Sequence, residues 1–186
     1  MRYPRVALVS FSKEVPIPEG VSVSVEGDRV IVEGPKGKLE RKYMPEFVDI
    51  TVERDVVRLV TYDRRKFNKA YLGTCAAHIR NMIKGVTEGF KREMIVAFAH
   101  FPIRVEVDES KKLVLIKNFL GERSVRTAKI VGDVKVTVKD DRLIIEGISK
   151  EDVCQTAANI RQATKIKRKD PRVFQDGIYV VPEGMS

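Results

Sequence analysis

The chain has 186 residues, and its 35 Lys and Arg side chains outnumber 26 Asp and Glu side chains, for a formal net charge of +9. This charge favours polyanionic partners, nucleic acid before an acidic membrane surface, and says nothing about the fold. No apolar stretch approaches the roughly 20 residues of a membrane-spanning helix, which excludes a helical membrane protein.

The N-terminal region predicts a β-hairpin. The apolar run within residues 1–11 is too short for a convincing signal peptide, so we expect none. Residues 21–25 alternate valine with polar residues, the period of a strand with one buried face. A turn at 27–28 then leads into the apolar residues 30–32, which completes the hairpin.

The next segment, Gly34-Pro35-Lys36-Gly37-Lys38, is glycine-rich and basic, so a phosphate-binding loop has to be considered. A P-loop needs four residues between its glycines and a helix after it, because helix amides cradle the phosphates. Only two residues separate these glycines, and a strand-like segment follows. We therefore predict an exposed turn, with a phosphate contact from Lys36 or Lys38 as a secondary RNA-binding candidate.

A long helix is predicted after a strand near residues 51–55. At helical spacing, the side chains that should face the core are Phe67, Tyr71, Cys75, Ile79, Met82, Ile83 and Val86. Gly85 is the predicted helix stop, because glycine is common just beyond helix ends.

The second half of the chain shows the same order of elements. Residues 94–98 predict a strand that joins the halves. Residues 103–107 alternate as a strand, and the apolar run 113–116 follows a turn. Ser149 is a predicted cap for a second helix, with Asp152 three residues later as in a capping box. The apolar face of this helix is Val153, Ala157, Ile160 and Ala163.

An internal repeat accounts for this order. Residues 76–81, Ala-Ala-His-Ile-Arg-Asn, match residues 157–162, Ala-Ala-Asn-Ile-Arg-Gln, and residues 51–55 match 137–141. Each copy predicts an α+β unit in which one helix packs on a small, mainly antiparallel β-sheet. The domains we expect are a first repeat at 1–90, a second repeat with its linking strand at 91–164, and a basic C-terminal extension at 165–186.

The end of the second helix leads into a strongly basic segment, opposed only by Asp170. Its cations are Arg161, Lys165, Lys167, Arg168, Lys169 and Arg172. Such side chains bind phosphates, and counterion release supplies much of the free energy. A solvated tail is the alternative, although disordered tails seldom carry apolar runs like residues 174–181. Phe174 and Tyr179 are candidates for base stacking; for the apolar residues here we favour packing against the second sheet.

Catalytic and metal-binding chemistry finds no support in the sequence. His78 and His100 are the only histidines, and neither has the spacing of a metal ligand or of a nucleophile's base. Cys75 and Cys154 lie far apart, so we interpret both as core thiols in a reducing compartment. We expect no enzyme, no metal, no cofactor and no small-molecule substrate.

Two segments carry a resemblance to a known family. Residues 155–163 and 168–179 resemble the signature of the large-subunit ribosomal protein L6 family, in its archaeal and eukaryotic branch, and the hairpin at 23–37 is similar to the family's start. The resemblance extends from Val15 to Val180.

The resemblance implies a duplicated α+β fold and a structural, non-catalytic role in the cytoplasmic large ribosomal subunit. Its second copy and C-terminal segment would bind large-subunit (23S-type) rRNA near the sarcin–ricin loop and the translation-factor binding region, beside other large-subunit proteins. The implied positions are Arg161, Lys167, Arg168, Lys169, Arg172, Phe174, Asp176, Gly177 and Tyr179, with the cations as phosphate contacts and Asp176-Gly177 as a turn.

Two other functions stay open on the residues alone. Exposed strand edges would suit a scaffold that recruits protein partners, with the charge serving solubility. A hydrolase or nuclease ranks last, because no catalytic constellation is visible.

Overall fold

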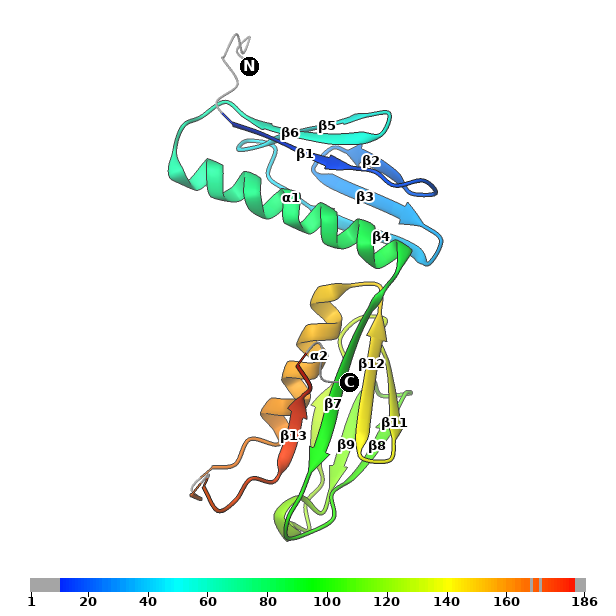
Figure 1. Ribbon diagram of the computed structural model, residues 1–186, viewed down its shortest axis with the longest axis vertical. Coiled ribbons are helices and arrows are strands. Elements are labelled where there is room, and N and C mark those ends of the chain that lie inside the picture. Colours follow the sequence, from blue (N-terminus) through cyan, green and yellow to red (C-terminus); the bar gives the residue numbers. More distant parts are fainter. Residues whose placement is uncertain (1–10, 168, 171, 183–186) are drawn as a thin grey trace. The chain divides into compact units, whose positions relative to one another are not determined.

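The computed structural model describes residues 11–167, 169–170 and 172–182. The chain divides between Glu88 and Gly89 into two units (Figure 1). Each unit combines one α-helix with small sheets whose strand pairs, within the described residues, are all antiparallel. The predicted α+β fold class is confirmed.

The first unit contains two three-stranded sheets and a long helix. Its elements are β1 (Phe11–Pro16), β2 (Ser22–Glu26), β3 (Arg29–Gly34), β4 (Gly37–Lys42), β5 (Asp49–Glu53), β6 (Val56–Thr61) and α1 (Lys66–Thr87). The strand orders are β2-β3-β4 and β1-β6-β5. The predicted turn at 27–28 joins β2 to β3.

The second unit has the same elements, one more strand and a short 3-10 helix. They are β7 (Phe90–Ala97), β8 (Arg104–Asp108), β9 (Leu113–Lys117), the short 3-10 helix η1 (Phe119–Gly121), β10 (Arg126–Lys129), β11 (Lys135–Lys139), β12 (Arg142–Gly147), α2 (Lys150–Ala163) and β13 (Gly177–Val180). The strand orders are β10-β9-β8 and β11-β12-β7-β13.

The internal repeat is visible in the sheet topology. Strand β7 lies beside β12, as β1 lies beside β6, and β11 completes one sheet as β5 completes the other. The only additional strand in the described part of the second unit is β13, which pairs with the free edge of β7 (Figure 1). The strand predicted at 94–98 is thus an inner strand of this sheet.

Each unit has its own hydrophobic core. In the first, residues such as Val32, Leu59 and Ile79 pack between the sheets and α1, and in the second Leu143, Ile145 and Ile160 do the same. In the predicted buried stripe of α1, Tyr71 is only partly buried and Phe67 is 57 % exposed, whereas the other five residues are buried. Phe67 lies in the first turn of the helix, where its ring stacks on Tyr71 instead of entering the core.

The predicted end of α1 is wrong by one turn. The helix continues through Gly85 to Thr87, and the Glu88 amide still donates to the Lys84 carbonyl. Gly89 follows with a φ of 81°, a left-handed conformation that glycine adopts readily just beyond a helix. Gly85 is itself buried inside the helix. Gly85 and Gly89 both fit the sequence pattern of a glycine just beyond a helix end, but only Gly89 has that role.

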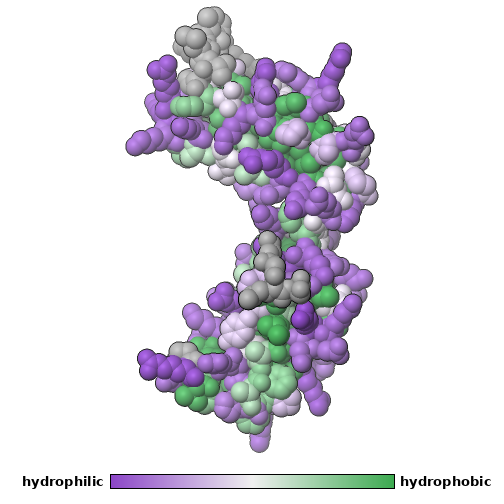
Figure 2. Space-filling view, in the orientation of Figure 1, coloured by the Kyte–Doolittle hydropathy of each residue, from purple (hydrophilic) through white to green (hydrophobic). Residues whose placement is uncertain are grey.

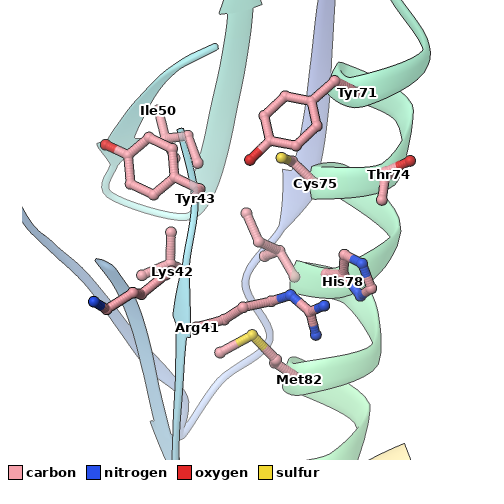
Figure 3. Close-up of a pocket in the computed structure, with 11 residues that line it drawn as sticks. Arg41, Lys42, Tyr43, Ile50, Tyr71, Thr74, Cys75, His78 and Met82 are labelled. Carbon is pink, nitrogen blue, oxygen red and sulfur yellow. The ribbon is translucent and has the colours of Figure 1, made fainter. Parts of the chain in front are cut away.

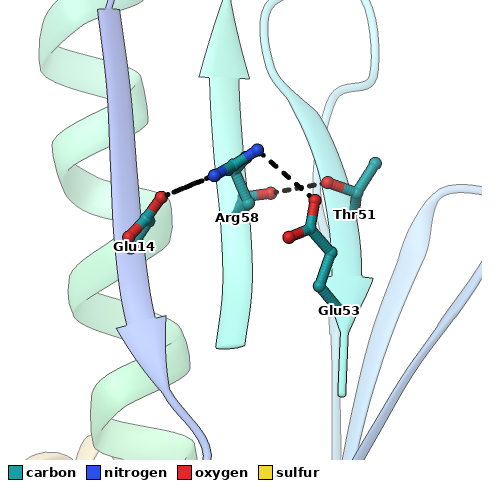
Figure 4. A network of polar contacts seen from close by, with 4 residues as sticks. All are labelled: Glu14, Thr51, Glu53 and Arg58. Carbon is teal, nitrogen blue, oxygen red and sulfur yellow. Dashed lines mark hydrogen bonds and ion pairs between the residues drawn. The ribbon is translucent and has the colours of Figure 1, made fainter. Parts of the chain in front are cut away.

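Polar side chains cover most of the visible surface of each unit, with apolar residues in small patches (Figure 2). An ion-pair network on the β1-β6-β5 sheet illustrates this. Arg58 on β6 contacts Glu14 at 3.0 Å and Glu53 at 3.4 Å on the flanking strands (Figure 4). All three side chains are well exposed, so the network contributes little to stability.

Candidate nucleic-acid interface

The candidate interface begins at the C-terminal end of α2. Ser149 caps the helix as predicted, accepting a hydrogen bond from the Asp152 amide at 3.3 Å. At the other end, the buried Thr164 hydroxyl donates to the Ile160 carbonyl and accepts from the Ile178 amide, both bonds within 3.3 Å. This hydroxyl joins the end of α2 to strand β13, so the segment between them is tied down at both ends.

The predicted cations extend from the last turn of α2 into this tied segment. The exposed ones are Arg161, Lys165, Lys167, Lys169 and Arg172. Arg168 lies outside the described residues. Within the part of the chain that the structure describes, no carboxylate lies within ion-pair distance of these five side chains. They are therefore available to an external anion.

Two open grooves adjoin this segment, and Lys165 borders both. One, of about 540 Å³, is lined by Arg161, Phe174 and Tyr179 among others. The second, of about 630 Å³, is lined by Lys165, Lys167 and Lys169. Concave surfaces that present several cations suit the curved backbone of a polyanion.

Arg126 is a further cation at the second groove, and its role is structural. It donates to the Ala163 carbonyl at the end of α2 at 2.8 Å and is paired with Glu122 at 2.6 Å. Its guanidinium also lies 4.3 Å from the centre of the Phe119 ring. The Arg126 hydrogen bond holds the pKa of Glu122 below its usual range. Arg126 thus fixes the end of α2.

The two predicted stacking residues take different positions. Phe174 is half-buried, with the His100 ring stacked on it at 5.2 Å and the Lys169 ammonium 4.3 Å from its centre. Tyr179 is 41 % exposed, but its hydroxyl donates to the Gln175 carbonyl and its ring covers Gly177. Ile178 between them is buried in the core, as expected for packing against the second sheet.

Asp176 has a role that the sequence did not reveal. We expected a turn at Asp176-Gly177, but Gly177 begins β13 and the Asp176 carboxylate is buried. It accepts hydrogen bonds from the Ala99 amide at 2.7 Å and from His100. Burial by itself raises the pKa of Asp176, but these hydrogen bonds outweigh it and the net pKa is lowered. No local pattern distinguishes such a carboxylate from a turn aspartate, because its partners lie some 75 residues away.

The secondary candidates, Lys36 and Lys38, lie in the first unit. The segment 34–38 is a hairpin turn between β3 and β4, as predicted. The Lys36 amide donates to the Val86 carbonyl and its ammonium to the Glu88 carbonyl, so Lys36 satisfies the end of α1. Lys38 is exposed on β4.

A pocket of about 240 Å³ lies between β4 and α1 in the first unit (Figure 3). Tyr71 and Cys75 point into it from α1, and Arg41 and Tyr43 face them from the opposite wall. Burial raises the pKa of the Cys75 thiol, which keeps it protonated and unreactive. Among the described residues, no group of His, Cys, Asp and Glu could hold a metal ion. Neither helix in the described ranges is both long and apolar enough to cross a membrane.

Comparison with known proteins gives consistent matches. The family model described as Ribosomal protein L6 matches residues 17–89 and again residues 101–177. A large ribosomal subunit protein uL6 from Methanobrevibacter smithii is 53 % identical over 177 residues, which cover 95 % of this chain and 98 % of the relative. The uL6 proteins of Staphylothermus marinus and Methanosarcina mazei are 50 % and 51 % identical, over 96 % and 91 % of this chain and 98 % and 96 % of their own lengths.

Proposed function

The chain belongs to the ribosomal protein L6 family and is a structural, non-catalytic protein of the large ribosomal subunit, and we propose that its second unit binds large-subunit rRNA. The relatives named above come from archaea, in agreement with the predicted archaeal and eukaryotic branch. As a large-subunit protein it acts in the cytoplasm.

One observation carries the proposal: exposed cations that have no carboxylate within ion-pair distance among the described residues are gathered on a folded support. Lys165, Lys167 and Lys169 lie between α2 and β13, both of which belong to the second unit's core. A free tail would lose conformational entropy on binding, whereas a segment tied at both ends has lost much of it already. Each cation that meets a phosphate releases condensed counterions, which favours binding without any sequence preference.

The RNA surface that we propose consists of Arg161, Lys165, Lys167, Arg168, Lys169 and Arg172 as phosphate contacts, with Phe174 and Tyr179 at its edge. Lys36 is a weaker candidate because it already satisfies the end of α1. Lys38 is the better secondary candidate. We further propose, from family resemblance, that the surface lies near the sarcin–ricin loop and the translation-factor binding region, beside other large-subunit proteins.

Incorporation of tagged protein into large subunits, followed on sucrose gradients, tests the proposal. The variant K165E/K167E should stay near the top of the gradient, since losing two phosphate contacts costs on the order of thirtyfold in affinity near 150 mM salt. The matched control is K135E/K139E, which makes the same charge change at two exposed positions of β11 in the same unit. It should comigrate with the large subunit.

Equal incorporation of both variants would reject the proposed surface. A small, ribosome-free complex formed by the wild-type chain would instead favour the protein-scaffold alternative.

A further inference from the structure

The connection from β7 to β8 exposes two aromatic rings. Phe98 is 43 % exposed and Phe101 is 47 % exposed, although large apolar side chains gathered on a surface are usually covered by a partner. This connection and the segment that leads into β13 lie at the same end of the second unit (Figure 1). Unlike Tyr179, these two exposed aromatic residues were not singled out by the sequence patterns.

The backbone that carries these rings is held at several points. The Asp176 carboxylate accepts hydrogen bonds from the Ala99 amide at 2.7 Å and the His100 ring at 3.2 Å. Asn118 donates to the Pro102 carbonyl at 3.0 Å. The Phe101 ring rests on Gly121, where a Cβ atom would lie only 3.3 Å from it. A surface fixed in this way loses little entropy when it binds.

Ring contacts connect this loop to the cations. The His100 ring stacks on Phe174 with centres 5.2 Å apart, and the Lys169 ammonium lies 4.3 Å from the centre of the Phe174 ring. A ligand that rests on Phe98 or Phe101 would therefore find positive charge close by, at Lys169 and in the segment that follows it. This combination of aromatic rings and cations matches the chemistry of a nucleotide with an exposed base.

We infer that Phe98 and Phe101 form a stacking surface for an unpaired RNA base, and that Asp176 positions their loop beside the cations. The inference rests on the proposed function and deepens it, since it specifies RNA with an unstacked base and not only a duplex backbone. A base offers a π-face whatever its identity, so the surface adds affinity with little sequence preference. The charge beside the rings favours this occupant over an apolar protein surface.

Two RNA probes test the inference with the full chain: a large-subunit rRNA hairpin with 2-aminopurine at one unpaired position, and a blunt duplex of equal length. F98A/F101A should bind the hairpin roughly ten- to a hundredfold more weakly than wild type, because an unpaired base loses affinity when the phenylalanine ring on which it stacks is removed. Its affinity for the duplex should change less than twofold. Stacking should quench the 2-aminopurine fluorescence with wild type and not with the variant.

The controls separate this inference from the proposed function. F67A removes a phenylalanine of the first unit that is 57 % exposed, more than Phe98 or Phe101, and should bind both probes as wild type does. K165E/K167E should lose affinity for both probes. Wild-type binding of the hairpin by F98A/F101A, or equal losses on hairpin and duplex, would overturn the stacking surface alone. Wild-type binding of both probes by K165E/K167E would overturn the proposed function, and the inference with it.

Discussion

At the scale of single residues, a few buried polar groups of the second unit hold the interface in shape. Thr164 connects the end of α2 to β13, and Asp176 connects the start of β13 to the loop after β7. Both have partners distant in sequence, and both are almost completely buried. Such groups are costly to leave unpaired, so each fixes a local geometry that the exposed cations depend on.

Replacing Asp176 with Asn should lower the free energy of unfolding at pH 7 by about 1–2 kcal/mol, because charge-assisted hydrogen bonds become neutral ones. The folded pKa of Asp176 is below its usual range. The stabilisation is therefore fully present above about pH 4 and is lost as the pH falls through the folded pKa. Urea unfolding of both proteins between pH 7 and pH 3 measures this. A difference between them that stays constant over this range would show that the charge is not the stabilising feature.

At the scale of elements, β13 is what distinguishes the second unit from the first. It pairs with β7 from Gly177 to Val180 and places Ile178, 1 % exposed, in the core. This strand turns the basic segment from a tail into a loop fixed at both ends. We propose that this docking is the reason why the RNA surface would lie on the second unit and not on the first.

Ile178→Ala should therefore lower the free energy of unfolding by about 2–5 kcal/mol, the usual cost of a cavity at a buried isoleucine. It should also weaken RNA binding, although the Ile178 side chain is itself buried in the core. Val173→Ala is the control: Val173 is 60 % exposed, so its stability should change by less than about 0.5 kcal/mol. Chemical denaturation and an RNA titration of both variants check this. An I178A protein that is destabilised but has wild-type RNA affinity would show that RNA binding does not depend on the docking of β13.

The sequence predicted most of the elements because their signals are local. The alternation of residues 21–25 and the cap at Ser149 each depend on a few neighbouring residues. The end of α1 was misplaced because Gly85 and Gly89 give similar signals, and only the conformation of Gly89 separates them. The pairing of β13 with β7 and the contacts of Asp176 join residues some 80 positions apart, so no local pattern could reveal them. The apolar run at 174–181 did indicate packing, but not its partner strand.

At the scale of the whole molecule, each unit has its own core and its own helix. The family model also matches each unit separately. The boundary between them lies at Glu88 and Gly89. We propose that the units are independent folding domains and that the second contains the RNA-binding function.

A fragment of residues 89–186 should therefore fold cooperatively and bind large-subunit rRNA within about fivefold of the full chain, while residues 1–88 should bind at least tenfold more weakly than the full chain. Circular dichroism and an RNA titration of the two fragments provide the measurement. Similar affinities for both fragments would assign an equal share of binding to the first unit.

The most direct test of the central claim, that the cations after α2 bind an RNA backbone from a folded support, is the salt dependence of rRNA affinity for the intact protein. About six phosphate contacts predict a loss of roughly a thousandfold between 50 and 200 mM salt. K165E/K167E/K169E should reduce the slope by about three. An affinity that does not change with salt, or the same slope in this variant, would contradict the account.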